Sequence, residues 1–374
     1  MTYRISVDTG GTFTDVVVSD ESGRLELGKA PSTRARAYEG LREGIGQVAE
    51  RLGLSVEGLL AQTEVLTYGT TRATNAIVEG KTARTAFFTT EGFPDILLVR
   101  EGGKPDPFKQ IPYPAPYVPR WLTFEIRERM DSDGEPFLAL DEASVVEAIG
   151  RARELRVGEL LDELLPGVPY TLSHRLNPVI REYRRASSTA IDASLMPLMQ
   201  AHLPELEQDL RDAGFTGELL AATSFGGVMH LRDLAARPIN AVKSGPALAP
   251  VAAKHYAGVE GKGDNIIACD TGGTSFDVSL VRDGLIKFTR ETWLGGRFVG
   301  HMTGMSSVDV RSIGAGGGSI AWMDPGGLLR VGPHSAGAYP GPACYGRGGE
   351  NPTVTDAALV LGYLDPEYFL GGRM

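Results

Sequence analysis

The chain has 374 residues, of which 37 are Lys or Arg and 47 are Asp or Glu, so its formal net charge is −10. Nucleic-acid partners are not expected, because they require a basic face. The cysteines, Cys269 and Cys344, stand apart from any Cys-x-x-Cys or Cys/His group, which argues against a disulfide framework and a thiolate zinc site. No apolar run is long enough to cross a bilayer, so we expect a cytoplasmic protein with no membrane partner.

Apolar residues recur with helical or strand periodicity along most of the chain. Steps of three and four from Tyr38 to Leu52 predict an amphipathic helix, and Asp141 is a suitable N-cap for a helix whose pattern runs to Leu165. Residues 101–121 and 311–356 are rich in Gly and Pro and predict irregular segments. The other predicted elements are strands at 4–7, 16–19, 25–27, 65–68 and 85–89, mostly helical structure at 178–213, and strands at 218–222, 265–269 and 276–281.

One motif occurs twice. Residues 7–16 read Val-Asp-Thr-Gly-Gly-Thr-Phe-Thr-Asp-Val, and residues 269–278 read Cys-Asp-Thr-Gly-Gly-Thr-Ser-Phe-Asp-Val. Each copy predicts a strand, a glycine-rich tip and a returning strand. We therefore place a domain boundary near 170–175, with a first lobe at 1–172 and a second lobe at 173–374, each holding one copy.

The residue types in these tips suit phosphate binding. Two adjacent glycines leave backbone N–H groups free to face an anion, and hydroxyl groups add donors. Asp8 and Asp270, at the ends of the first strands, are candidate catalytic residues that can hold Mg²⁺ or its water, since Mg²⁺ keeps few protein carboxylates. The remaining candidate phosphate contacts are Thr9, Gly10, Gly11, Thr12, Thr14, Thr271, Gly272, Gly273, Thr274 and Ser275.

The repeat resembles the phosphate-clamping hairpins of the sugar-kinase, actin and Hsp70 superfamily. That resemblance implies a two-lobed α/β, ribonuclease H-like ATPase fold that uses ATP and Mg²⁺. The alternative to a phosphate-binding role is that each motif is only a tight hairpin turn. No Gly-Lys-Ser/Thr follows the glycines, as a Walker A loop requires, and a strand rather than a helix follows them, which disagrees with a Rossmann fingerprint.

Three further segments could contribute to the site. The tract at 313–320 contains Gly314, Gly316, Gly317 and Gly318, which would approach adenosine in this superfamily; a flexible loop is the alternative. Lys243 could meet a phosphate or be solvated. The candidate substrate or phosphate contacts that follow a predicted strand are Thr70, Thr71 and Asn75, although Thr70 could instead cap a helix.

The chain also resembles the ATP-dependent hydantoinase A/5-oxoprolinase family, which includes subunits of acetone and acetophenone carboxylases. The segments that carry the resemblance, in family order, are 7–15, 69–76, 180–187, 244–247, 270–277, 313–320 and 341–346. It implies that ATP phosphorylates an oxygen of a weakly electrophilic substrate. That substrate is a cyclic amide whose ring then opens, or a ketone joined with bicarbonate. A B-type partner subunit, a hetero-oligomer and a further divalent metal (Zn or Mn) elsewhere in the complex are also implied.

Some positions depart from the family pattern. Residues 309–312 read Asp-Val-Arg-Ser where Asp-Ile-His-Thr is common, and Tyr339 replaces an aspartate. By comparison with the family pattern, we also expect that a segment near 155–158 and the long C-terminal portion are not included in this sequence, through truncation, deletion or omission. We expect a ketone-carboxylase-type subunit that phosphorylates a carbonyl or enol oxygen, because the loop at 100–108 and the Pro-Tyr repeats at 112–117 resemble those members. The alternatives are a cyclic-amide hydrolase subunit and a non-catalytic nucleotide-binding scaffold.

Overall fold

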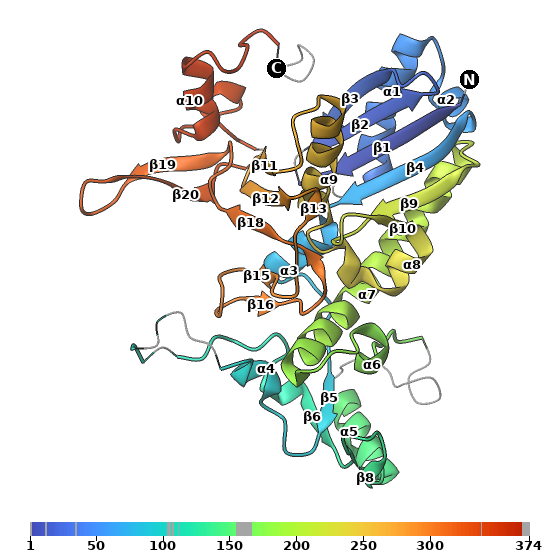
Figure 1. Ribbon diagram of the computed structural model, residues 1–374, viewed down its shortest axis with the longest axis vertical. Helices are drawn as coiled ribbons and strands as arrows, with labels where there is room; N and C mark the ends of the chain where they lie inside the picture. The colour runs from blue at the N-terminus through green and yellow to red at the C-terminus, as the bar shows by residue number, and fades with distance from the viewer. Residues whose placement is uncertain are drawn as a thin grey trace.

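The computed structural model describes residues 2–11, 13–33, 36–102, 106, 108–110, 112–154, 167–337 and 339–368. Two β-sheets face each other across the centre of the molecule, and a smaller group of elements lies at one end (Figure 1). The chain is an α/β protein, as its sequence predicts. None of the helices in the described ranges is long and apolar enough to cross a membrane.

The first sheet has six strands in the order β10-β9-β4-β1-β2-β3. β1 runs antiparallel to β2 and parallel to β4, and β4 runs parallel to β9. All the strands predicted between 4 and 68 are confirmed, with extended ends. The bounds are β1 Tyr3–Thr9, β2 Phe13–Asp20, β3 Leu25–Pro31, β4 Thr63–Thr70, β9 Glu218–Ala222 and β10 Val228–His230.

Alternation along the strands gives this sheet one apolar face. Ile5, Val7 and Val16 lie on it and are at most 4% exposed. The predicted helix is confirmed as α1 (Ala37–Leu52), and it packs against the sheet beside the long helix α7 (Glu182–Asp212). The other helices of this layer are α2 Val56–Ala61, α3 Arg72–Val78, α6 Ser173–Leu176 and α8 Leu231–Ala236.

A small module lies at the far end of α7 (Figure 1). Its strands β5 (Phe87–Thr90) and β6 (Thr123–Ile126) are parallel and pack on α5 (Glu142–Glu154). Asp141 caps α5 by accepting the Ala143 N–H, as predicted. The part of this helix expected at 155–165, and the segment expected to be missing near 155–158, lie outside the described residues. The module also contains α4 Ile96–Val99, η1 Arg120–Leu122, β7 Arg129–Met130 and β8 Pro136–Leu138.

The second sheet holds the other copy of the motif. β12 lies between β11 on one side and β13 and β18 on the other. The prediction that 311–356 is irregular is wrong, because β18, a two-stranded ribbon and α10 lie there. The bounds are β11 Ile266–Thr271, β12 Phe276–Arg282, β13 Leu285–Ile286, β14 Phe288–Thr289, β15 Trp293–Leu294, β16 His301–Met302, β17 Ser307–Val308, β18 Val310–Ile313, β19 Ser319–Met323, β20 Leu329–Ser335, η3 Ala343–Tyr345 and α10 Val354–Val360.

The connection between the sheets runs through η2 (Pro238–Ala241) and α9 (Ser244–Val259). β9 and β10 come after residue 172 in the chain but belong to the first hairpin's sheet. The boundary expected near 170–175 therefore does not separate the two sheets. The start of α9 approaches the first hairpin at Asp8, whereas the glycine-rich turn of the second hairpin contacts residues 316–318.

Candidate functional site

The two copies of the motif form hairpins of the same register. Asp8 lies opposite Asp15 in the β1–β2 pair, and Asp270 lies opposite Asp277 in the β11–β12 pair. An antiparallel pair places directly opposite side chains on the same face of the sheet. Each hairpin therefore presents two carboxylates at its tip, and the repeat found in the sequence is a repeat in three dimensions.

The tips also close in the same way. The Gly10 N–H donates to the Phe13 carbonyl at 2.9 Å, and the Gly272 N–H donates to the Ser275 carbonyl at 2.9 Å. Each tip is thus a short turn around two glycines, as the sequence predicts. Thr12 lies outside the described residues, so its expected phosphate contact cannot be placed.

The charge of the second hairpin acts on a carboxylate of the first. Burial raises the pKa of Asp8 above its usual value, and the charges of Asp15 and Asp270 raise it further, while Lys29 opposes them. Burial and the charge of Asp277 likewise raise the pKa of Asp270. The charge of Asp270 therefore reaches Asp8, although the two residues belong to different hairpins. Such a concentration of negative charge suits a site that receives a cation.

The backbone beneath Asp8 leaves no room for side chains. A Cβ on Gly69 of β4 would lie 3.2 Å from the Asp8 Oδ1 atom and 3.2 Å from the Val7 carbonyl oxygen. On the other side, a Cβ on Gly245 of α9 would lie 4.0 Å from the same Oδ1 atom. The Asp8 carboxylate is therefore held between the first sheet and the beginning of α9.

Two of the three candidate contacts after β4 lie at the first tip. The Thr71 N–H donates to the Thr9 carbonyl at 3.2 Å, and the Asn75 Nδ2 atom donates to the Thr71 hydroxyl at 3.2 Å. The Asn75 amide also lies 3.7 Å from the position of a Cβ on Gly11. Thr70 is different: it is 3% exposed, and its hydroxyl accepts the Arg72 N–H at the start of α3. The Thr70 hydroxyl therefore bonds with the first residue of α3, although the N-cap position itself is Thr71.

The turn of the second hairpin packs against the glycine tract at 313–320. The Gly317 and Gly318 N–H groups donate to the Gly272 and Gly273 carbonyls at 2.9 and 2.7 Å. A Cβ on Gly316 would lie 2.5 Å from the Ser275 nitrogen, closer than any side chain can approach. These three glycines thus serve the contact of one backbone with another. Their expected approach to adenosine stays a prediction, and their N–H groups at 317 and 318 are already paired.

Gly314 occupies a different position in that tract. It lines a shallow groove of about 630 Å³ whose walls include Trp322 and Arg330 from the β19–β20 ribbon. The Trp322 indole N–H donates to the Gly332 carbonyl, which fixes the ring. Gly314 is therefore the member of the tract that borders open space. Thr271 and Thr274 are exposed at the second tip, while the Ser275 hydroxyl donates to the Asp277 Oδ2 atom at 3.1 Å.

Thr14 does not reach the cleft. It is 0% exposed, and its hydroxyl bonds with the Ser32 hydroxyl at 3.0 Å. The reason is strand alternation, because Thr14 is in step with Val16 and Val18, whose side chains face the core. The structure thus separates Thr14 from the other hydroxyl groups proposed to contact phosphate.

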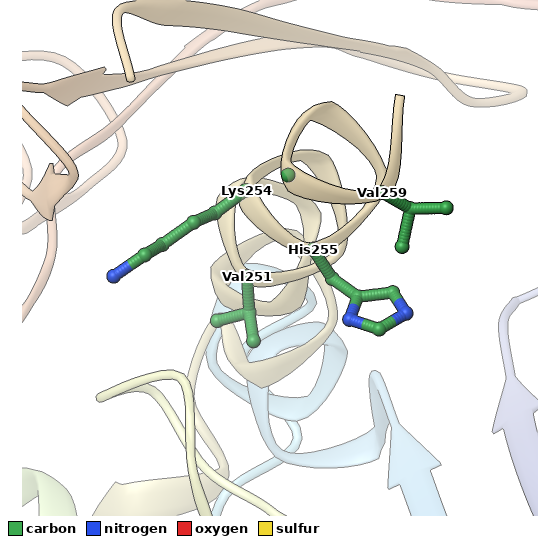
Figure 2. A pocket seen from close by; sticks show the side chains of 5 residues that line it. Val251, Lys254, His255 and Val259 are labelled. Carbon is green, nitrogen blue, oxygen red and sulfur yellow. The ribbon is translucent and has the colours of Figure 1, made fainter. Parts of the chain in front are cut away.

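A second hollow, of about 540 Å³, lies on α9 itself. Figure 2 shows Lys254 extending to one side of the helix and His255 and Val259 to the other, with Val251 between them. All its lining residues lie between Val251 and Val259 of α9, whereas Gly245 at the helix start is the residue that approaches Asp8. The hollow is therefore separate from the hairpin site.

The described side chains include no group of three metal-ligating residues. Asp8 and Asp270 would then need phosphate oxygens and waters to complete an Mg²⁺ site. Mg²⁺ usually binds in this way, with one or two carboxylates, several waters and the phosphates of the substrate. The conjecture of a further Zn or Mn elsewhere in a complex stays a prediction.

The fold and site place the chain in an enzyme family. It belongs to the hydantoinase/oxoprolinase family: the model "Hydantoinase/oxoprolinase" matches residues 185–374, and "Hydantoinase/oxoprolinase N-terminal region" matches residues 4–158. This confirms the resemblance found in the sequence.

Two relatives are similar over nearly the whole chain. Caprolactamase subunit alpha of Pseudomonas jessenii is 38% identical, over 100% of this chain and 56% of that protein. Acetophenone carboxylase gamma subunit of Aromatoleum aromaticum is 34% identical, over 99% of this chain and 54% of that protein. The chain thus spans about half the length of these relatives.

Two solved structures share the fold. The nucleotide-free structure of acetone carboxylase has a TM-score of 0.83 and 27% identity, and it covers 99% of this chain and 56% of that one. The crystal structure of the ATP-dependent caprolactamase from Pseudomonas jessenii has a TM-score of 0.82 and 37% identity, with the same coverage. The α/β architecture is therefore that of these two enzymes.

Proposed function

We propose that the chain is a subunit of an ATP-dependent enzyme that transfers the terminal phosphoryl group of ATP to an oxygen of a carbonyl compound. The observation that carries this proposal is the pair of hairpins in identical register, with the charge of Asp270 in the second hairpin acting on Asp8 in the first. Phosphoryl transfer needs positioning and charge neutralisation more than covalent chemistry, and paired tips of this kind supply both. The acetone carboxylase and caprolactamase relatives, both named as ATP-dependent, support it.

The proposal gives the site residues distinct roles. The glycine tips bind phosphate oxygens through the backbone N–H groups of Gly11 and Gly273, since those of Gly10 and Gly272 close the turns, and exposed Thr271 and Thr274 add hydroxyl donors. Asp8 and Asp270 would hold Mg²⁺, which supplies charge neutralisation when it is bound with the nucleotide. Thr71 and Asn75 lie where the acceptor could be oriented, and Gly314 borders the groove that we assign to adenosine.

We also propose that the fold is the two-lobed ATPase fold of actin, Hsp70 and the sugar kinases. One lobe would contain the six-stranded sheet and the other the sheet of β11, β12, β13 and β18. Their division would then lie between His230 and Ile266, where α9 connects them, rather than near residue 172. Internal duplication of the hairpin is what supports this division.

The acceptor belongs to one of two chemical classes. A cyclic amide is favoured by the 38% identity with caprolactamase subunit alpha. A ketone, with bicarbonate, is favoured by the 34% identity with the acetophenone carboxylase subunit and by the loop at 100–108. Both relatives are named as subunits, which supports a hetero-oligomer containing a B-type partner.

ATP turnover by the purified complex distinguishes these candidate functions. Turnover should rise several-fold on adding a lactam such as caprolactam, or on adding acetone or acetophenone together with bicarbonate. Stimulation by the lactam identifies a cyclic-amide hydrolase, and stimulation by the ketone with bicarbonate identifies a ketone carboxylase. Nucleotide binding without turnover under any of these conditions would instead support the non-catalytic scaffold.

A further inference from the structure

The beginning of α9 is built into the site more tightly than the sequence suggests. Lys243, the residue before the helix, has φ 59° and ψ 30°, which is the left-handed conformation that few residues other than glycine adopt. Its N–H donates to the Thr74 hydroxyl of α3 at 2.9 Å. Gly245, two residues on, is the residue that approaches Asp8. The strained turn therefore joins the start of α9 to α3 and leads into the residue that approaches Asp8.

Two buried polar atoms at this point have no hydrogen-bond partner within the described structure. One is the hydroxyl of Ser244, which is 1% exposed, and the other is Oδ1 of Asp277, which is 7% exposed. An unpaired buried polar group is costly, so such groups usually mark a ligand or a functional contact. Ser244 directly follows Lys243 in the chain, and the charge of Asp277 acts on Lys243.

Two of the cations that act on this region are already in ion pairs. Lys29 is paired with Asp15, and Arg311 forms a close ion pair with Asp309 at 2.9 Å. Lys243 is largely enclosed, and its burial lowers its pKa, while Asp277 raises it and Arg311 lowers it. A largely enclosed ammonium group in this position has lost much of its hydration and gains most from a strongly anionic partner.

We propose that Lys243 and Ser244, at the positive end of the α9 dipole, bind the terminal phosphoryl group of ATP between Asp8 and Asp277. The inference rests on the proposed function and adds the groups that distinguish ATP from ADP. The start of a 16-residue helix favours a phosphate anion, the ammonium adds a full positive charge, and the unpaired hydroxyl adds a donor. Lys243 thereby offsets the repulsion that the carboxylates would exert on the phosphoryl oxygens.

The test compares MgADP with the non-hydrolysable MgAMPPNP by titration calorimetry on the full protein. Lys243→Met removes the charge at similar length and should weaken MgAMPPNP binding about 10- to 100-fold while changing MgADP binding less than about threefold. Lys243→Arg, which keeps the charge, should restore part of the loss. Lys254→Met is the matched control, because Lys254 lies on the same helix but extends from its exposed side (Figure 2).

Ser244→Ala provides a second variant that the fold should tolerate, since the hydroxyl it removes bonds with none of the described groups. It should weaken MgAMPPNP about tenfold and leave MgADP unchanged. Equal losses for both nucleotides in these variants, or no loss, would overturn the inference while leaving the proposed function intact. Failure of the wild-type protein to bind either nucleotide would refute the proposed function itself, and the inference with it.

Discussion

Replacement of Asp270 by Asn tests whether the second hairpin is chemical or only structural. The Asp270 carboxylate is exposed and accepts no hydrogen bond from the described residues, so the nearly isosteric Asn should change the free energy of unfolding by less than about 0.5 kcal/mol. Asp270 also raises the pKa of Asp8, so that pKa should fall in the variant. Loss of one charge at the transferring phosphoryl should lower ATP turnover about 100-fold, or about 2.7 kcal/mol of barrier.

The assay is steady-state ATP turnover by the complete complex with its activating substrate, alongside nucleotide affinity by calorimetry. Asp283→Asn is the matched control, because Asp283 lies in the opposite turn of the same sheet and its side chain is 75% exposed. The control should keep wild-type turnover. Turnover by Asp270→Asn within a few-fold of the wild type would refute the catalytic role and favour the scaffold.

Three further predictions concern the metal, the glycine tract and a buried carboxyl. Mg²⁺ should bind only together with nucleotide, because Asp8 and Asp270 are too few ligands alone; tight binding to the nucleotide-free protein, by calorimetry, would contradict this. Gly316→Ala should destabilise the fold by about 1–3 kcal/mol in urea unfolding, because its Cβ would lie 2.5 Å from a backbone nitrogen, whereas Gly150→Ala, with nothing within 4 Å, should not. Burial raises the pKa of Asp192 from 3.8 to about 6, so the folded state holds that proton more tightly than the unfolded chain and stability is lost as the pH rises through about 6. Asp192→Asn should remove this pH dependence, so the unfolding free energy of the variant relative to wild type should rise by up to about 3 kcal/mol between pH 4 and 7. If that difference in unfolding free energy is the same at both pH values, the raised pKa of Asp192 is excluded.

The hairpins were predictable because each is encoded in one short stretch. Apolar alternation marks the strands, and paired glycines mark the turns, so both copies could be placed from sequence alone. The same alternation would also have assigned Thr14 to the core, since it is in step with Val16 and Val18. That error arose from reading Thr14 by its hydroxyl rather than by its position in the strand.

The sheet order and the domain boundary could not be predicted in the same way. β9 pairs with β4 although about 150 residues separate them in the chain, and parallel pairing leaves no turn signal to reveal the partner. The ribbon of β19 and β20 was missed because its Gly and Pro content is typical of loops. Long-range pairing therefore decides both features.

Parts of the site also depend on tertiary structure. Gly69 and Gly245 approach Asp8 from elements far apart in the chain, and although both lie in segments that carry the family resemblance, their sequence context does not show that they meet there. The glycines at 316–318 were recognised in the sequence, but their role could not be predicted from it. A sequence cannot tell whether glycine allows a ligand or another backbone to approach, and here it allows the second hairpin to do so.

A crystal structure of the protein with MgAMPPNP tests the central claim most directly, namely that the two hairpins form one nucleotide site. We predict phosphate oxygens within hydrogen-bonding distance of the N–H groups of both Gly11 and Gly273, with Mg²⁺ near Asp8 and Asp270. Nucleotide bound at one tip only, or at a surface remote from both, would contradict the account.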